Sequence, residues 1–126
     1  MTAPGFEPTP AASGPRVEGF AGRGFSVDGR VYQALLLTPE SVSPWDAPAL
    51  AALEAGHVET ALAAQPEFLL LGTGARQGFP PRSFVAALEA RGVGVEAMDS
   101  RAAARTWGLL RAEGRWIAAA LMPLEK

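Results

Sequence analysis

Apolar and polar residues follow one another in blocks along the second half of the chain. Residues 68–71 are all apolar and lead to Gly72, which is typical of a short strand buried on both faces. A helix with Pro81 in its first turn is then indicated by apolar residues at helical spacing, namely Phe84, Val85 and Leu88. Arg91 and Gly92 predict the end of that helix, since they supply a C-terminal cation and a residue free to adopt positive φ.

A second strand, a longer helix and a third strand complete this half. Residues 93–98 form the strand, and Asp99 or Ser100 stands where a helix N-cap belongs. The apolar stripe of the helix consists of Ala103, Trp107 and Leu110. After Gly114, residues 115–121 form the third strand. This order predicts an α/β domain in which residues 67–122 make a parallel strand-helix-strand-helix-strand core, with helices covering a mixed sheet.

The first half predicts a hairpin. The residue pair Asp28-Gly29 separates two β-prone runs, residues 24–27 and 30–37, and favours a type I′ turn with positive φ at both positions. We expect an N-terminal antiparallel hairpin at the edge of the mixed sheet or packed on it. A helix is expected at residues 57–64, whereas residues 49–55 do not indicate one structure because Gly56 interrupts an Ala- and Leu-rich stretch.

The N-terminal residues 1–16 differ in composition from the rest. They are rich in Pro, Gly, Ala and Ser, with Phe6 as their one large apolar side chain, so they favour a flexible tail. The remaining residues, 17–126, have the size of one domain. No apolar stretch approaches the roughly 20 residues that a membrane span requires, and prolines interrupt any secretory signal. We therefore expect a cytoplasmic protein without a membrane span.

Composition excludes several kinds of chemistry. The chain of 126 residues has 11 Lys and Arg against 13 Asp and Glu, no Cys and one His. The net charge of −2 disfavours nucleic acid as a partner, since a phosphate backbone requires clustered cations. The absence of Cys excludes thiolate nucleophiles and cysteine-ligated metals, and a single His excludes multi-histidine metal sites. We expect neither a metal nor a cofactor.

The candidate site lies where the predicted parallel strands end, since ligands of open α/β sheets bind outside these carboxyl ends. Gly72, Thr73 and Gly74 follow the first strand and would allow a tight turn with outward amides, while Asp99 follows the second. Arg105, or Arg76, could pair with an anion there. These residues define a candidate binding crevice with no catalytic residues assigned.

Structural roles explain many of the same residues. The glycines can serve only to turn the chain, Asp99 can be a helix N-cap, and Arg105 can pair with Asp99. The glycine spacing matches neither a dinucleotide fingerprint nor a triphosphate-binding loop, which requires Lys. We expect His57 to be a surface or capping residue. Trp45, Trp107 and Trp116 are expected in core or interface packing.

Several segments together resemble one known family. They are residues 69–74, 80–81, 95–107, 113–115 and 118–121, with further matches at 24–25, 28–29 and 44–45. Over roughly residues 17–124 the chain looks like the small α/β domain family of formerly unknown function that is typified by mitochondrial complex I assembly factor 3. The resemblance implies the crevice positions Gly72, Thr73, Gly74, Asp99 and Arg105, and it implies no catalytic residue. Ala104 departs from the Cys expected there, so thiol chemistry is excluded at that position.

Two functions follow as expectations. The resemblance implies a non-enzymatic binding or assembly-type module with a protein partner, and for the mitochondrial members it implies a role in assembly of the respiratory NADH dehydrogenase. The alternative is a binder of a small molecule or anion, or a weak enzyme, that uses Gly72, Thr73, Gly74 and Asp99. The sequence leaves homo-oligomerisation open.

Overall fold

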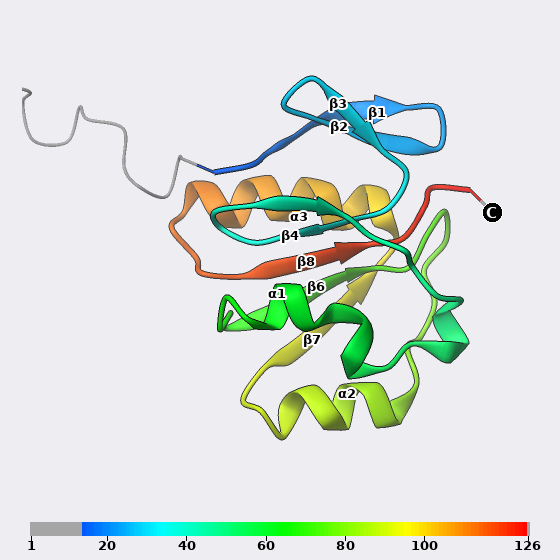
Figure 1. The fold of residues 1–126 in the computed structure, drawn as a ribbon, viewed down its shortest axis with the longest axis vertical. Helices are drawn as coiled ribbons and strands as arrows, with labels where there is room; N and C mark the ends of the chain where they lie inside the picture. Colours follow the sequence, from blue (N-terminus) through cyan, green and yellow to red (C-terminus); the bar gives the residue numbers. More distant parts are fainter. Residues whose placement is uncertain (1–13, 126) are drawn as a thin grey trace, which may run out of the picture.

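The computed structural model describes residues 14–125, and its centre is a mixed five-stranded sheet (Figure 1). The strand order is β5-β4-β8-β6-β7, with β6 parallel to both β7 and β8 and with β4 antiparallel to β8 and β5. The predicted parallel core is therefore confirmed. The strands are β4 (Leu35–Leu37), β5 (Val42–Pro44), β6 (Phe68–Gly72), β7 (Gly94–Met98) and β8 (Ala118–Leu121).

Helices cover both faces of this sheet. The helix α3 (Ser100–Ala112) lies on one face, whereas α1 (Glu59–Leu62) and α2 (Arg82–Glu89) lie on the other (Figure 1). Side chains of β6 alternate between the two cores, because successive residues of a strand point to opposite faces. Leu70 joins the core beneath α3, while Leu69 and Leu71 join the core beneath α1 and α2. Burial on both faces explains why the sequence of β6 is continuously apolar.

A separate three-stranded antiparallel sheet covers the outer side of α3 (Figure 1). It consists of β1 (Val17–Ala21), β2 (Gly24–Val27) and β3 (Arg30–Tyr32). The predicted turn is confirmed, since Asp28 has φ 50° and Gly29 has φ 78°. Phe25 and Val27 are fully buried and belong to the same hydrophobic core as Trp107 of α3. The hairpin is thus packed on the domain rather than paired at the edge of the larger sheet.

The expected single strand over residues 30–37 is wrong. It breaks after Tyr32, and the chain crosses to the five-stranded sheet, where β4 pairs with β8. The reason is burial. All three leucines of β4 are buried, and because successive side chains of a strand point to opposite faces, they require a core on each side of the sheet. A hairpin strand with one face towards solvent could not bury them.

The segment before β6 forms short helical turns. The expected helix at 57–64 begins earlier, as a 3₁₀ helix at Ala55–Val58 that leads into α1, and Leu50–Ala52 form another 3₁₀ turn. The expectation that His57 caps a helix is confirmed, because its Nδ1 accepts a hydrogen bond from the backbone N–H of Glu54 at 2.9 Å. The third strand, expected from residue 115, begins at Ala118.

The folded part reaches further towards the N-terminus than the expected boundary at residue 17. Pro15 is buried, and its carbonyl oxygen accepts a hydrogen bond of 3.0 Å from Nε1 of the fully buried Trp107. This bond ties the start of the three-stranded sheet to α3. The rest of the expected flexible tail, residues 1–13, lies outside the described residues.

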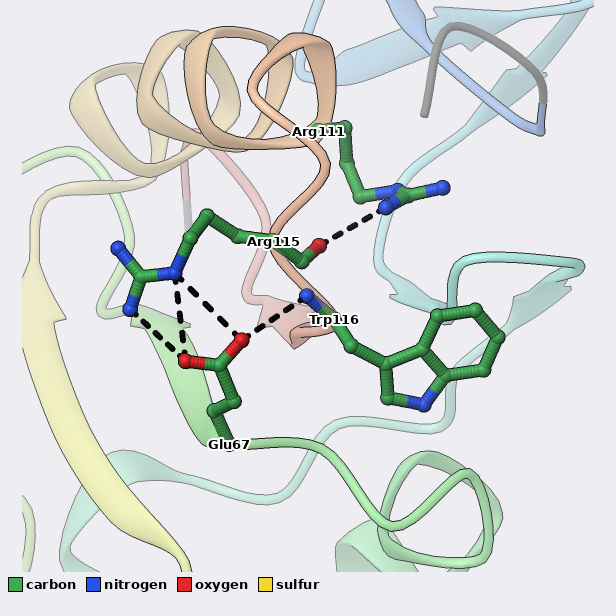
Figure 2. A network of polar contacts seen from close by, with 4 residues as sticks. All are labelled: Glu67, Arg111, Arg115 and Trp116. Atoms are coloured by element: carbon green, nitrogen blue, oxygen red, sulfur yellow. Dashed lines mark hydrogen bonds and ion pairs between the residues drawn. The ribbon is translucent and has the colours of Figure 1, made fainter. Parts of the chain in front are cut away.

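A polar network joins the starts of β6 and β8 (Figure 2). Glu67, which precedes β6, accepts hydrogen bonds from the guanidinium of Arg115 and from the backbone N–H of Trp116, at 3.0 and 3.2 Å. The hydrogen bond from Arg115 lowers the pKa of the Glu67 carboxyl most, and the hydrogen bond from the Trp116 backbone lowers it further. The network therefore clamps two parallel strands at their N-terminal ends with a carboxylate that stays ionised.

Among residues 14–125, none of the helices has both the length and the apolar character that crossing a bilayer requires.

The Trp107 hydrogen bond generates a first prediction. Trp107→Phe should lower the free energy of unfolding by about 2–4 kcal/mol, because it leaves the buried Pro15 carbonyl unpaired and opens space in the core. Trp116→Phe is the matched control: its indole also donates to a carbonyl, that of Ala64, but the ring is 41% exposed and water can replace it. The control should lose less than about 1.5 kcal/mol in urea unfolding. Equal losses would contradict this account.

The Glu67 network generates a second prediction. A carboxyl whose pKa is lowered by folding stabilises the protein above its unfolded pKa, and this contribution is lost as the pH falls through the folded value. Glu67→Gln should therefore lower the unfolding midpoint at neutral pH and approach the wild type in acid. Thermal unfolding from about pH 7 to pH 2.5 measures this, with Glu89→Gln on the exposed side of α2 as the control. A difference that persisted unchanged in acid would exclude the charge as its cause.

Candidate functional site

The carboxyl ends of the three parallel strands are joined by backbone hydrogen bonds. The N–H of Thr73 donates to the carbonyl of Met98 at 2.8 Å, and the N–H of Met122 donates to the carbonyl of Gly72 at 3.0 Å. The N–H of Ser100 donates to the carbonyl of Gly74, also at 2.8 Å. The loop after β6 is consequently held between the start of α3 and the residue that follows β8.

Ser100 is the residue that completes this arrangement; the sequence places it in the loop after the second parallel strand, but not among the predicted crevice residues. Its side chain is fully buried, and its hydroxyl donates to the carbonyl of Met122 at 2.8 Å while accepting from the N–H of Gly74 at 2.9 Å. One hydroxyl thus connects the loops that follow β6 and β8. The sequence signal was limited to a serine in the first turn of a helix, since both partners are more than 20 residues away.

Gly72 allows Ser100 at the start of α3 to lie close to the end of β6. A Cβ atom at this position would lie 2.7 Å from Oγ and 2.9 Å from Cα of Ser100, so any side chain would push α3 away from β6. Gly74 has φ +109°, a conformation that favours glycine. Both glycines are therefore required by the turn and by packing.

The expected outward amides are not found in the first part of the loop. The N–H groups of Thr73 and Gly74 donate to protein oxygens, as described above, and the N–H of Gly78 donates to Oγ1 of Thr73 at 3.0 Å. The Thr73 hydroxyl itself lies 2.7 Å from the Arg76 carbonyl and 3.2 Å from the Met98 carbonyl, and it donates to these oxygens. Its hydrogen bonds hold the loop closed rather than face a ligand.

Asp99 and Arg105 do not form a pair with each other. Asp99 is the N-cap of α3, because its Oδ1 accepts a hydrogen bond from the N–H of Ala102 at 2.9 Å. Arg105 is exposed and forms no ion pair with Asp99, so the expected internal pairing is wrong. Arg101 instead places its guanidinium 5.7 Å from the centre of the Phe20 ring, a cation–π contact that offsets an unfavourable position near the helix N-terminus.

A groove of about 720 Å³ lies beside the loop. Three segments line it, residues 47–50, 73–76 and 122–123, together with Glu125. Of the predicted crevice, Thr73 and Gly74 border the groove, whereas Gly72, Asp99 and Arg105 do not. Arg76 and Glu125 are its charged residues, and most of the remaining lining is apolar. Within residues 14–125, no cluster of three or more His, Asp or Glu side chains could hold a metal ion.

The Ser100 bridge generates a third prediction. Ser100→Ala should lower the free energy of unfolding by about 1–3 kcal/mol, because two buried polar groups lose their partner. Amide hydrogen exchange at Gly74 should become faster in the same variant. Ser83→Ala, at an exposed position of α2, is the control and should match the wild type within about 0.5 kcal/mol. Unchanged exchange at Gly74 would show that the hydroxyl does not hold the loop.

Comparison with known proteins places this architecture in a family. A family described as proteins of unknown function (DUF498/DUF598) matches residues 17–122. A solved structure from Bordetella pertussis, described as a Mth938-like domain, superimposes with a TM-score of 0.78 at 30% identity, covering 100% of this chain and 94% of that one. The fold predicted from the sequence and its resemblance is therefore confirmed.

Two relatives illustrate the range of the family. An uncharacterized protein of Rhodobacter capsulatus is 38% identical over 86% of this chain and 84% of its own length. The zebrafish protein named NADH dehydrogenase [ubiquinone] 1 alpha subcomplex assembly factor 3 is 31% identical over 90% of this chain and 67% of its own length. With the match extending over residues 17–122, the chain belongs to the DUF498/DUF598 family of proteins of unknown function.

Proposed function

We propose that this protein is a non-enzymatic binding module that acts in assembling a protein complex, with the respiratory NADH dehydrogenase as the complex. The observation that carries the proposal is the similarity, over 90% of the chain, to a protein named as an assembly factor of that dehydrogenase. The alignment spans 116 residues, so most of the folded domain has a counterpart in that relative.

The use of the polar groups at the strand ends supports binding rather than catalysis. The hydroxyls of Thr73 and Ser100 are occupied by backbone groups, and Asp99 caps a helix. His57 uses its Nδ1 in a cap. A nucleophile needs an adjacent base to activate it, and none of these groups forms such a pair.

The groove is the surface that we assign to the partner, and its occupant is an apolar segment of a protein subunit. Leu50, Met122 and Pro123 offer apolar contacts, while Arg76 and Glu125 offer one charge of each sign to orient the segment. The loop that borders the groove continues past Gly78, which lies against Leu50, to Phe79. The Phe79 ring is 85% exposed, which suits an aromatic anchor at an interface.

This proposal generates a fourth prediction. Phe79→Ser should reduce the recovery of NADH dehydrogenase subunits with the tagged protein about tenfold, since burying an aromatic anchor contributes 1.4 kcal/mol or more to binding. The folded state should be unaffected because the ring is exposed. Quantitative mass spectrometry after mild crosslinking in the source cells measures the recovery.

Leu109→Ser is the matched control for this experiment. Leu109 is 68% exposed on α3, so its substitution removes a comparable apolar side chain away from the groove. Recovery of the subunits should equal that of the wild type. Absence of dehydrogenase subunits from the wild-type sample would contradict the proposed function. Equal recovery with Phe79→Ser would show only that this surface does not bind the partner.

A further inference from the structure

The groove beside the loop after β6 is closed at one end. Its three wall segments, residues 47–50, 73–76 and 122–123, lie on the right-hand side of Figure 1, at the carboxyl ends of β6 and β8. The first two walls meet at Gly78, because a Cβ atom there would lie 2.7 Å from Cδ2 of Leu50. A segment bound between these walls cannot continue past this contact, so the groove favours the end of a chain.

Arg76 lies at this closed end. The Thr73 hydroxyl donates to the Arg76 carbonyl at 2.7 Å and accepts from the N–H of Gly78 at 3.0 Å. One hydroxyl thus holds Arg76 and Gly78 in the same compact turn, and Gly78 contacts Leu50. The Arg76 backbone is therefore fixed near the point where the walls meet, and Arg76 lines the groove with an exposed side chain.

The donors of this turn have no acceptor in the described part of the chain. The ion pairs seen within residues 14–125 do not include Arg76, and its guanidinium forms no hydrogen bond there. The backbone N–H groups of Ala75 and Arg76 likewise donate to no oxygen of these residues, and both residues line the groove. A guanidinium beside free backbone amides is a donor set with which proteins bind a carboxylate.

The rest of the groove indicates what accompanies the carboxylate. Glu125 also lines the groove and forms no ion pair with Arg76, so the Arg76 charge is left for a ligand. The Glu125 carboxylate repels a ligand with several negative charges, which disfavours a phosphate group. Most of the remaining lining is apolar, and a volume of about 720 Å³ suits the last few residues of a peptide.

We propose that the groove binds the free C-terminus of a partner protein. The terminal carboxylate accepts hydrogen bonds from the Arg76 guanidinium and from the amides of Ala75 and Arg76, while apolar side chains of the last residues contact Leu50 and Met122. This inference rests on the proposed function and adds the chemistry by which the partner is recognised. A chain end supplies one carboxylate and an apolar segment in a single ligand, and it fits a groove that is closed at its cationic end.

Binding of short peptides to the full chain tests this inference. The probes are N-acetylated hexapeptides of Ala, Val, Leu, Ile and Phe that end in a free carboxylate, and each has a matched peptide that ends in an amide. Two-dimensional NMR spectra of the protein follow each titration. The free acids should shift the backbone signals of residues 75–77 saturably and bind about tenfold or more tightly than the matched amides, because the amide loses the charge-assisted hydrogen bonds.

Two arginine variants locate the carboxylate. Arg76→Gln should remove most of the preference for the free acid and leave the other signals unchanged, since the side chain is exposed. Arg82→Gln is the matched control, because Arg82 is exposed at the start of α2 and does not line the groove. This control should bind the acids like the wild type. Equal effects of the two substitutions would overturn the proposal.

Further peptides and the recovery of dehydrogenase subunits separate the remaining outcomes. A hexapeptide with Glu as its last residue and an amidated end should bind as weakly as the other amides, and tight binding would exclude recognition of a chain terminus. Equal binding of acids and amides, or no binding of any peptide at millimolar concentration, would also overturn this inference, although subunits recovered with the wild type would still support the proposed function. Preference for the acids without recovery of subunits would contradict the proposed function and leave the carboxylate site standing.

Discussion

The close contact between the start of α3 and the end of β6 is the constraint on which the rest of the domain depends. Gly72 has no side chain, which lets Ser100 approach β6, and the buried Ser100 hydroxyl then bridges Gly74 and Met122. This contact sets the position of α3 relative to the sheet, because it fixes the first residue of the helix against two parallel strands. The core beneath α3 and the three-stranded sheet that covers it are built on that position.

The same contact determines what the strand ends can do. In many α/β proteins this region presents free amides to a ligand. Here the amides of Thr73 and Gly74 and the Asp99 carboxylate are used to hold loops and a helix end. The neighbouring surface is a mostly apolar groove, and the exposed Phe79 ring follows in the same loop; this is the surface to which we assign the proposed protein partner.

The opposite end of the sheet has a different character. Glu67 clamps the starts of β6 and β8 through Arg115 and Trp116, and the buried Arg111 donates from Nη1 to the carbonyl of Arg115 in the same network (Figure 2). The end of α3 favours a cation through the helix dipole, and Arg111 also lies over the Trp116 ring with its Cζ 5.9 Å from the ring centre. The domain therefore has a groove at the carboxyl ends of its parallel strands and a hydrogen-bonded charged network at the starts of β6 and β8.

The sequence by itself determined several features that depend on local spacing: the buried strand before Gly72, the Asp28-Gly29 turn, the caps at Asp99 and His57, and the parallel order of the core. These features need only residues a few positions apart, or short connections that favour one handedness. Only the tertiary structure decided that β4 leaves the hairpin, that Ser100 bridges two loops, and that Arg115 pairs with Glu67. Their partners are distant in sequence, and a polar side chain's role depends on which groups folding places beside it.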